Sequence, residues 1–119
     1  MWQRRVIFSE IGSGHEIAVL DLNDDGLADI VANDNSRVSE RNTNATPGVH
    51  VFFSPEDPAT GEWIYRRIES EAAMNGCVTG DMNAPPDGLP DLICTGAGGK
   101  IRWYENLGNE EAAPEQAGM

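Results

Sequence analysis

Residues 21–29 read DLNDDGLAD, and residues 81–91 read DMNAPPDGLPD. In both stretches acidic and amide side chains lead up to a glycine, and an apolar segment follows. Asn, Asp and Gly are frequent turn formers, and short segments rich in β-branched residues are typical of strands. Each stretch therefore predicts a β-hairpin, and the similarity of the two indicates an internal repeat.

The repeat extends beyond the two acidic stretches. Further segments match at a spacing of roughly 60 residues, which lies within the range of propeller blades and similar arrays. The matching pairs are 16–34 with 76–96, 48–56 with 100–108, and WIYRRI (63–68) with WQRRV (2–6). The last pair joins the middle of the chain to its beginning, so one copy of the repeat is divided between the two ends.

The segments between the turns predict strands, because they are short and apolar or alternating, and no window shows sustained helical periodicity. The expected strands are 3–8, 16–21, 29–33, 49–54, 63–69, 76–80, 91–95 and 100–105. The predicted fold class is therefore all-β, with two four-stranded units per chain.

The two units are arranged differently along the chain. One unit is complete within 15–70. The other has three strands within 75–108, and residues 1–9 supply the fourth strand that completes such a unit in a neighbouring chain. Residues 109–119 are rich in acidic residues and form either a disordered tail or a linker between units.

The first acidic stretch has the donor set of a Ca²⁺ site, because Ca²⁺ accepts oxygen ligands in irregular geometry. The candidate ligands are Asp21, Asn23, Asp25, the carbonyl of Leu27, and Asp29. Neither His nor Cys lies in this loop, which disfavours Zn²⁺. A plain hairpin turn is the structural alternative, but it does not require four oxygen-bearing side chains in nine residues.

The second acidic stretch keeps the same residue types at a different spacing. Its candidate ligands are Asp81, Asn83, Asp87, the carbonyl of Leu89, and Asp91. The insertion of Ala84–Pro85–Pro86 shifts Asp87 relative to Asn83. Calcium binding and a metal-free turn both stay open for this loop.

DLNDDGLADIVAND followed by GVHVFF, and DGLPDLICTGAGGKIRWYEN, resemble FG-GAP or VCBS repeats. Such repeats form the blades of integrin-type β-propellers and of some fungal propeller lectins. The resemblance covers residues 1–108. It implies that the loop between the first and second strands of a blade binds Ca²⁺, which supports the five ligands named for the first stretch.

Two blades do not close a propeller, because propellers of this kind need about 4–8 blades. A two-blade chain exposes sheet faces and an open edge strand, so we expect it to associate with itself. Three chains complete six blades and four chains complete eight, which predicts a homotrimeric or homotetrameric ring. In this ring the strand at 3–8 pairs with residues 101–105 of the next chain. The alternative is a chain cut from a longer propeller.

The charge limits the possible partners. The chain has 20 acidic and 8 basic residues and a formal net charge of −12. Nucleic acid and anionic membranes require basic surfaces, so neither is an expected partner. No apolar run approaches the ~20 residues of a transmembrane helix. The chain carries no signal peptide, but a calcium site suits an extracellular setting, and we expect that location.

Cys77 and Cys94 flank the second acidic stretch. If Asp81 faces Asp91 across that hairpin, the two sulfurs lie on opposite faces of the sheet, because successive side chains alternate. The sequence therefore predicts two free, buried thiols.

A binding module is the expected function, and an enzyme is not. His15 and His50 are the only histidines, and neither belongs to a recognisable catalytic motif. Lectins, adhesion modules and protein-binding platforms all occur in the family that the chain resembles. A glycan and a protein partner are therefore both open, and the candidate ligand contacts are Asn33, Asp34, Asn35, Arg37 and Trp103. For the tryptophans, packing between blades is the structural alternative.

Overall fold

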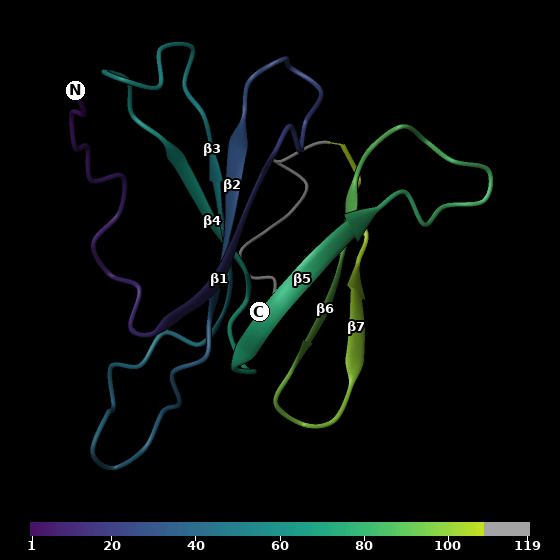
Figure 1. Cartoon of the computed structure of the whole chain (residues 1–119). Coiled ribbons are helices and arrows are strands. Elements are labelled where there is room, and N and C mark those ends of the chain that lie inside the picture. Colours follow the sequence, from purple (N-terminus) through teal and green to yellow (C-terminus); the bar gives the residue numbers. More distant parts are fainter. Residues whose placement is uncertain (109–119) are drawn as a thin grey trace.

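The computed structural model describes residues 1–108 as an all-β fold of two antiparallel sheets, without a helix in that range (Figure 1). The first sheet has the strand order β1-β2-β3-β4, and the second has the order β5-β6-β7. The strands are β1 (Gly14–Leu20), β2 (Asp29–Asp34), β3 (Gly48–Phe53), β4 (Ile64–Glu69), β5 (Met74–Gly80), β6 (Asp91–Gly96) and β7 (Ile101–Tyr104). The all-β prediction is confirmed. The predicted tail or linker at 109–119 lies outside the described residues.

The expected strand at 3–8 does not form within the single chain, so residues 1–108 contain seven strands in place of the expected eight. This segment runs along the outside of the first sheet (Figure 1), and residues 1–7 are exposed. A β-strand needs a neighbouring backbone to accept and donate its hydrogen bonds. None of the described strands pairs with this segment.

The second sheet repeats the pairing of the first three strands of the first sheet. Leu20 pairs with Asp29 at the end of the first hairpin, and Gly80 pairs with Asp91 at the end of the second. On the other side of β2 and β6, Ile30 pairs with Phe52 and Leu92 pairs with Tyr104. The same register therefore holds across both hairpins. Residues of the two sheets that share a place in this register are called equivalent below.

The main core lies where one face of the first sheet meets the second sheet. Strand β5 contacts both β1 and β2 across this junction. The buried cluster draws on both sheets and on the β4–β5 connection, and its members are Leu22, Val31, Val49, Val51, Ala72, Met74, Leu92 and Cys94. Burial of each large aliphatic side chain contributes on the order of 1.5–3 kcal/mol, so this junction holds the two sheets together.

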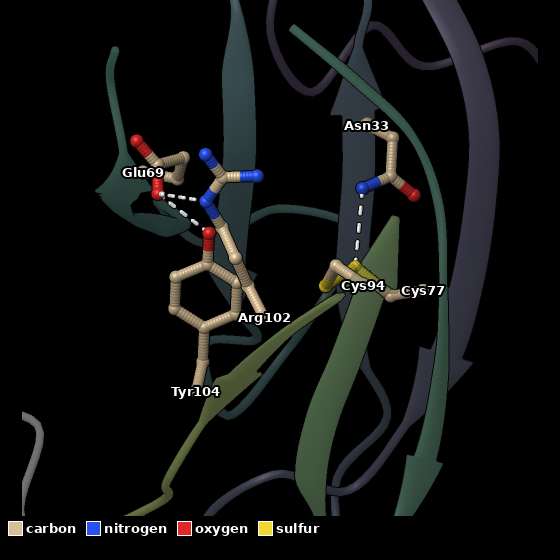
Figure 2. The surroundings of a disulfide bond; sticks show 6 residues. All are labelled: Asn33, Glu69, Cys77, Cys94, Arg102 and Tyr104. Atoms are coloured by element: carbon tan, nitrogen blue, oxygen red, sulfur yellow. Dashed lines mark hydrogen bonds and ion pairs between the residues drawn. A yellow bond between two sulfur atoms is a disulfide. The ribbon is translucent and has the colours of Figure 1, made fainter. Parts of the chain in front are cut away.

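Cys77 and Cys94 form a disulfide, so the prediction of two free thiols is wrong (Figure 2). The error is one residue of register. Asp91 pairs with Gly80 and not with Asp81, which places Cys77 directly opposite Cys94 on the same face of the sheet. In an antiparallel pair, directly opposed side chains are close enough for this bond.

The disulfide faces the first sheet. The side-chain amide of Asn33, on β2, donates a hydrogen bond to Sγ of Cys77 over 3.2 Å (Figure 2). Nearby, Glu69 of β4 accepts a hydrogen bond from the Tyr104 hydroxyl and lies 3.8 Å from the Arg102 guanidinium. These contacts join the two sheets and give the polar groups between them hydrogen-bond or ionic partners.

None of the described residues belongs to a helix long and apolar enough to cross a membrane.

Candidate functional site

The first acidic loop is shaped by its own carboxylates. Asp21 accepts hydrogen bonds from the backbone N–H groups of Asp25, over 3.2 Å, and Gly26, over 2.7 Å. The chain reverses through positive φ angles at Asp24 (59°) and Gly26 (85°), which is the conformation that Asp tolerates and Gly favours. Burial alone would raise the pKa of Asp21, but these backbone donors hold it below its usual value.

Asp29 anchors the same loop from the start of β2. Its side chain is fully buried, and its two oxygens accept N–H groups of Leu22, over 2.8 Å, and Ser54, over 2.9 Å. Burial raises the pKa of Asp29, and the negative charges of Asp25 and Asp21 add to that rise. One carboxylate therefore ties the loop, β2 and the end of β3 together.

The first loop brings acidic oxygens together in a way that suits a cation. Asp21, Asp25 and Asp29 each place one carboxylate oxygen within 4.8 Å of the other two. The side-chain amide of Asn23 lies beside them. With its nitrogen facing the carboxylates, it donates to Asp21 over 3.2 Å and to Asp25 over 3.0 and 3.3 Å. With its oxygen facing them, the amide adds one more oxygen to the group.

These residues therefore fit Ca²⁺, which binds carboxylate and amide oxygens and tolerates irregular geometry. Leu27, whose carbonyl is the remaining predicted ligand, follows the turn and donates its N–H to Asp25 over 2.9 Å. That bond fixes the backbone at the position where the carbonyl ligand is expected.

The second acidic loop has the same anchoring hydrogen bonds. Asp81 accepts the N–H of Gly88 over 2.7 Å, as Asp21 does from Gly26. Asp91 is fully buried and accepts the N–H groups of Met82 and Asn106, over 2.9 and 2.7 Å. The turn is therefore built on the same plan despite its two extra residues.

The second loop does not gather its acids as the first one does. Within residues 1–108, a group of three acidic oxygens forms only in the first loop. The side-chain amide of Asn83 donates to Glu105 over 2.6 Å. Asp87 stays exposed and accepts the N–H of Leu89 over 3.0 Å. The geometry favours the metal-free turn for this loop.

The predicted ligand contacts are not brought together. Asn33 is buried against the disulfide. Asp34 is fully buried, and its carboxylate accepts the N–H groups of Gly12, Ser13 and Ser36 and the hydroxyl of Thr46. Although burial acts to raise the pKa of Asp34, these donors hold it below its usual value. Both side chains therefore hold the fold and are not free for a ligand.

Asn35, Arg37 and Trp103 lie nearer the surface but apart from one another. The amide of Asn35 lies 3.4 Å from the amide oxygen of Asn75, on β5. Arg37 is exposed and lines a cavity, whereas Trp103 is half exposed and does not line it. Trp103 and its neighbour Arg102 point to opposite faces of β7, because side chains alternate along a strand.

The cavity that Arg37 lines is open and measures about 590 Å³. Its walls come from the β2–β3, β4–β5 and β6–β7 connections, so both sheets contribute to it. The polar side chains in its lining are Ser36, Arg37, Ser70, Glu71 and Arg102. Four of these were not predicted. The sequence IRWY (101–104) could have identified Arg102. Side chains alternate along a strand, so Arg102 lies on the face of β7 opposite to Trp103.

The two histidines have separate surroundings. His50 is fully buried, and since a carbonyl only accepts, its Nε2–H donates to Thr46 O over 2.8 Å. Its Nδ1 then accepts the Tyr65 hydroxyl over 2.7 Å. Burial lowers the pKa of His50, and this effect exceeds the opposing effect of the bond to Thr46. His15 is exposed, with Nδ1 2.7 Å from the carbonyl of Asn75.

Comparison of the chain with protein-family models, with curated proteins and with solved structures found no match.

Proposed function

We propose that this chain supplies two blades of a calcium-stabilised β-propeller of the FG-GAP or VCBS type and acts as a carbohydrate-binding module without catalytic activity. The observation that carries the binding role is the open cavity, which is lined by connections from both sheets and by Arg102 of β7. The repeated register and the repeated aspartate anchors support the blade interpretation.

Calcium has a structural role in this proposal. Asp21, Asp25 and the buried Asp29 each place one carboxylate oxygen within 4.8 Å of the other two. A bound Ca²⁺ offsets the repulsion among these carboxylates and fixes the loop between β1 and β2. The loop lies apart from the lining of the cavity, so the metal supports the scaffold and does not contact the glycan.

The cavity provides the groups that recognise sugar hydroxyls. Each sugar hydroxyl both donates and accepts hydrogen bonds, so guanidinium donors beside carboxylate acceptors suit it. Arg37 and Glu71 offer such a pair, and the serine hydroxyls of Ser36 and Ser70 add to it. None of the described residues that line the cavity is aromatic, which predicts weak binding to a single site. Several copies of the site on one assembly then raise the overall affinity.

Arg37→Ala tests the cavity as the glycan site. We expect the purified wild-type chain to bind ligands on a glycan array and the variant to lose at least tenfold in affinity, because it removes an exposed guanidinium donor from the lining. Arg41→Ala is the matched control, since Arg41 is an exposed arginine of the same connection that does not line the cavity. Its binding should equal that of the wild type.

Three results would contradict the glycan proposal. These are the absence of any glycan bound by the wild type, equal binding by the Arg37 variant, and binding that a free monosaccharide in excess does not compete. Thermal melting of both variants accompanies the array, because Arg37 makes no buried contact and its removal should leave the melting temperature unchanged.

The alternative function is a protein-interaction scaffold that binds no sugar. Exposed apolar side chains favour it, because patches of this kind mark interaction surfaces. Val78, Ile101 and Trp103 are 68%, 74% and 50% exposed. A chain that binds no glycan but associates through these side chains supports this alternative. An extracellular location is part of both proposals.

A further inference from the structure

The second sheet leaves one of its faces uncovered. Val78 pairs with Ile93, and Ile93 pairs with Trp103, so all three side chains lie on one face. Ile101 lies two residues before Trp103 and shares that face. We call these four residues the outer face. Three of them are at least half exposed, and Ile93 is half-buried.

The equivalent face of the first sheet is buried. By register, Val31 and Val51 stand at the positions of Ile93 and Trp103, because Val31 pairs with Val51 as Ile93 pairs with Trp103. Val51 is 3% exposed where Trp103 is 50% exposed. Val49, two residues before Val51, is 0% exposed where Ile101 is 74% exposed.

The face of the second sheet that lies opposite its outer face covers this face of the first sheet. That covering face includes Cys77, Leu92 and Cys94, which belong to or pack against the shared core. The first sheet has a face that is equivalent by register to this covering face. Ile17 stands at the position of Cys77, and Ile30 at that of Leu92. Ile17 is 69% exposed. This face of the first sheet is therefore exposed at Ile17 and buried at Phe52 and His50, which pair with Ile30 and Ala32.

The β7 edge is the second unsatisfied feature. Strand β4 pairs with β3 in the first sheet, but β7, the equivalent of β3, has no fourth strand among the described residues. Residues 2–10 (WQRRVIFSE) align without a gap with residues 63–71 (WIYRRIESE), and five of the nine positions are identical. The second of these segments contains β4.

The N-terminal segment also makes a contact equivalent to one made by β4. In this alignment Phe8 takes the position of Glu69, and Phe52 takes that of Tyr104. Glu69 contacts Tyr104 across the two sheets. Phe8 contacts Phe52 in the same way, with ring centroids 5.1 Å apart. The segment around Phe8 thus lies against the first sheet where the last strand of a preceding sheet would lie.

We propose that a second copy of this chain covers the outer face with its first sheet and adds its residues 3–8 to β7 as the fourth strand. The β3–β4 register places Gln3 opposite Glu105 and Arg5 opposite Trp103, since Phe53 pairs with Ile64 and Val51 with Arg66. Each copy gives one strand and receives one, so the contact is heterologous and closes into a ring. Closure with about six or eight blades needs three or four copies.

This inference rests on the blade repeat of the proposed function but not on its glycan or calcium site. Failure of the assembly is read from the solution mass, and failure of the glycan site from the comparison of Arg37→Ala with Arg41→Ala, so the two are distinguishable.

Solution mass tests the assembly. Light scattering on the full chain should give three or four times the single-chain mass of 12.9 kDa. Trp103→Glu places a charge in the outer face and should reduce the mass three- to fourfold. Val38→Glu is the matched control, because Val38 is 63% exposed and lies in the β2–β3 connection, outside the strands of both sheets. This variant should keep the wild-type mass.

Disulfide trapping tests the strand register and does not depend on how Trp103→Glu folds. Gln3→Cys and Glu105→Cys are made as separate chains and oxidised together. The mixture should yield a covalent dimer, and each variant alone should yield none through these cysteines. A wild-type chain of single-chain mass, an unchanged mass for Trp103→Glu, or the absence of cross-linking in the mixture would each overturn the proposal.

Discussion

Asp25 and Asp87 occupy the same position in the two acidic loops, and both accept the N–H of the leucine two residues later. Only Asp25 lies within a group of three converging acids in the described part of the chain. The ability of Asp25 to bind a cation therefore depends on the acidic residues beside it and not on its own hydrogen bond. The two residues form a matched pair for testing calcium.

We expect Ca²⁺ to raise the melting temperature of the wild-type chain and EGTA to lower it, because a ligand that binds only the folded state stabilises it. At a concentration one hundredfold above Kd the gain is about 2.7 kcal/mol. Asp25→Asn should abolish this difference while keeping the hydrogen bond to Leu27. Asp87→Asn should leave it unchanged. Melting curves that do not respond to EGTA would disprove a stabilising calcium site.

His50 gives the chain a specific response to acid. Its pKa is lowered by burial first, then by the positive charge of Arg67, while the bond to Thr46 and the charge of Asp34 oppose the shift. The unfolded chain therefore takes up a proton near pH 6.5, before the folded chain does. Proton uptake by the unfolded chain favours unfolding, so stability decreases as the pH falls below about 6.5.

We expect the free energy of unfolding, measured by urea titration, to fall by at most about 1.4 kcal/mol per pH unit from this group. His50→Gln should remove that slope between about pH 6.5 and 5.5, above the range where most carboxylates titrate. His15→Gln is the control, because His15 is exposed, and it should keep the slope. Equal slopes in all three proteins would show that His50 is not responsible.

At the level of the strands, the disulfide is the feature that sequence reasoning placed wrongly. The hairpin between β5 and β6 was expected to pair Asp81 with Asp91, which separates the two sulfurs. The backbone N–H of Met82 instead donates to Asp91 from outside the ladder. Asp91 thus pairs with Gly80, and a shift of one residue reverses the face of every side chain on the strand.

The disulfide should contribute measurably to stability, because it restricts the unfolded chain. Cys77 and Cys94 are separated by 17 residues, and a loop of this size corresponds to about 3 kcal/mol. The double variant Cys77→Ala/Cys94→Ala should lose about that much in urea unfolding. Reductant should destabilise the wild type to a similar extent and leave the variant unaffected. A wild type that is insensitive to reductant under unfolding conditions would contradict this role.

The β-strands were predictable because each is a short apolar or alternating segment between clear turn signals. The six strands from β1 to β6 begin and end within two residues of their predicted ranges, and β7 lies within 100–105. The segment 3–8 has an equally suitable sequence but forms no strand in the single chain. Strand formation there depends on a partner, which the sequence of the segment does not describe.

At the scale of the whole molecule, the converging acids of the first loop could be predicted, but the cavity could not. The loop is local, so the spacing of Asp21, Asp25 and Asp29 along the chain reflects their arrangement in space. The cavity is built from three connections that are distant in sequence. Which side chains meet there depends on how the two sheets pack, and residue spacing does not contain that information.

The buried aspartates make the acidic loops tolerant of length changes. Asp29 and Asp91 fix the loop start, the following strand and the end of the third strand with the same pair of hydrogen bonds. The second loop accommodates two extra residues between Asp81 and Gly88 while these bonds persist. The tip of the hairpin is thus free to diverge, or to accept a grafted sequence, without disturbing the register of the sheet behind it.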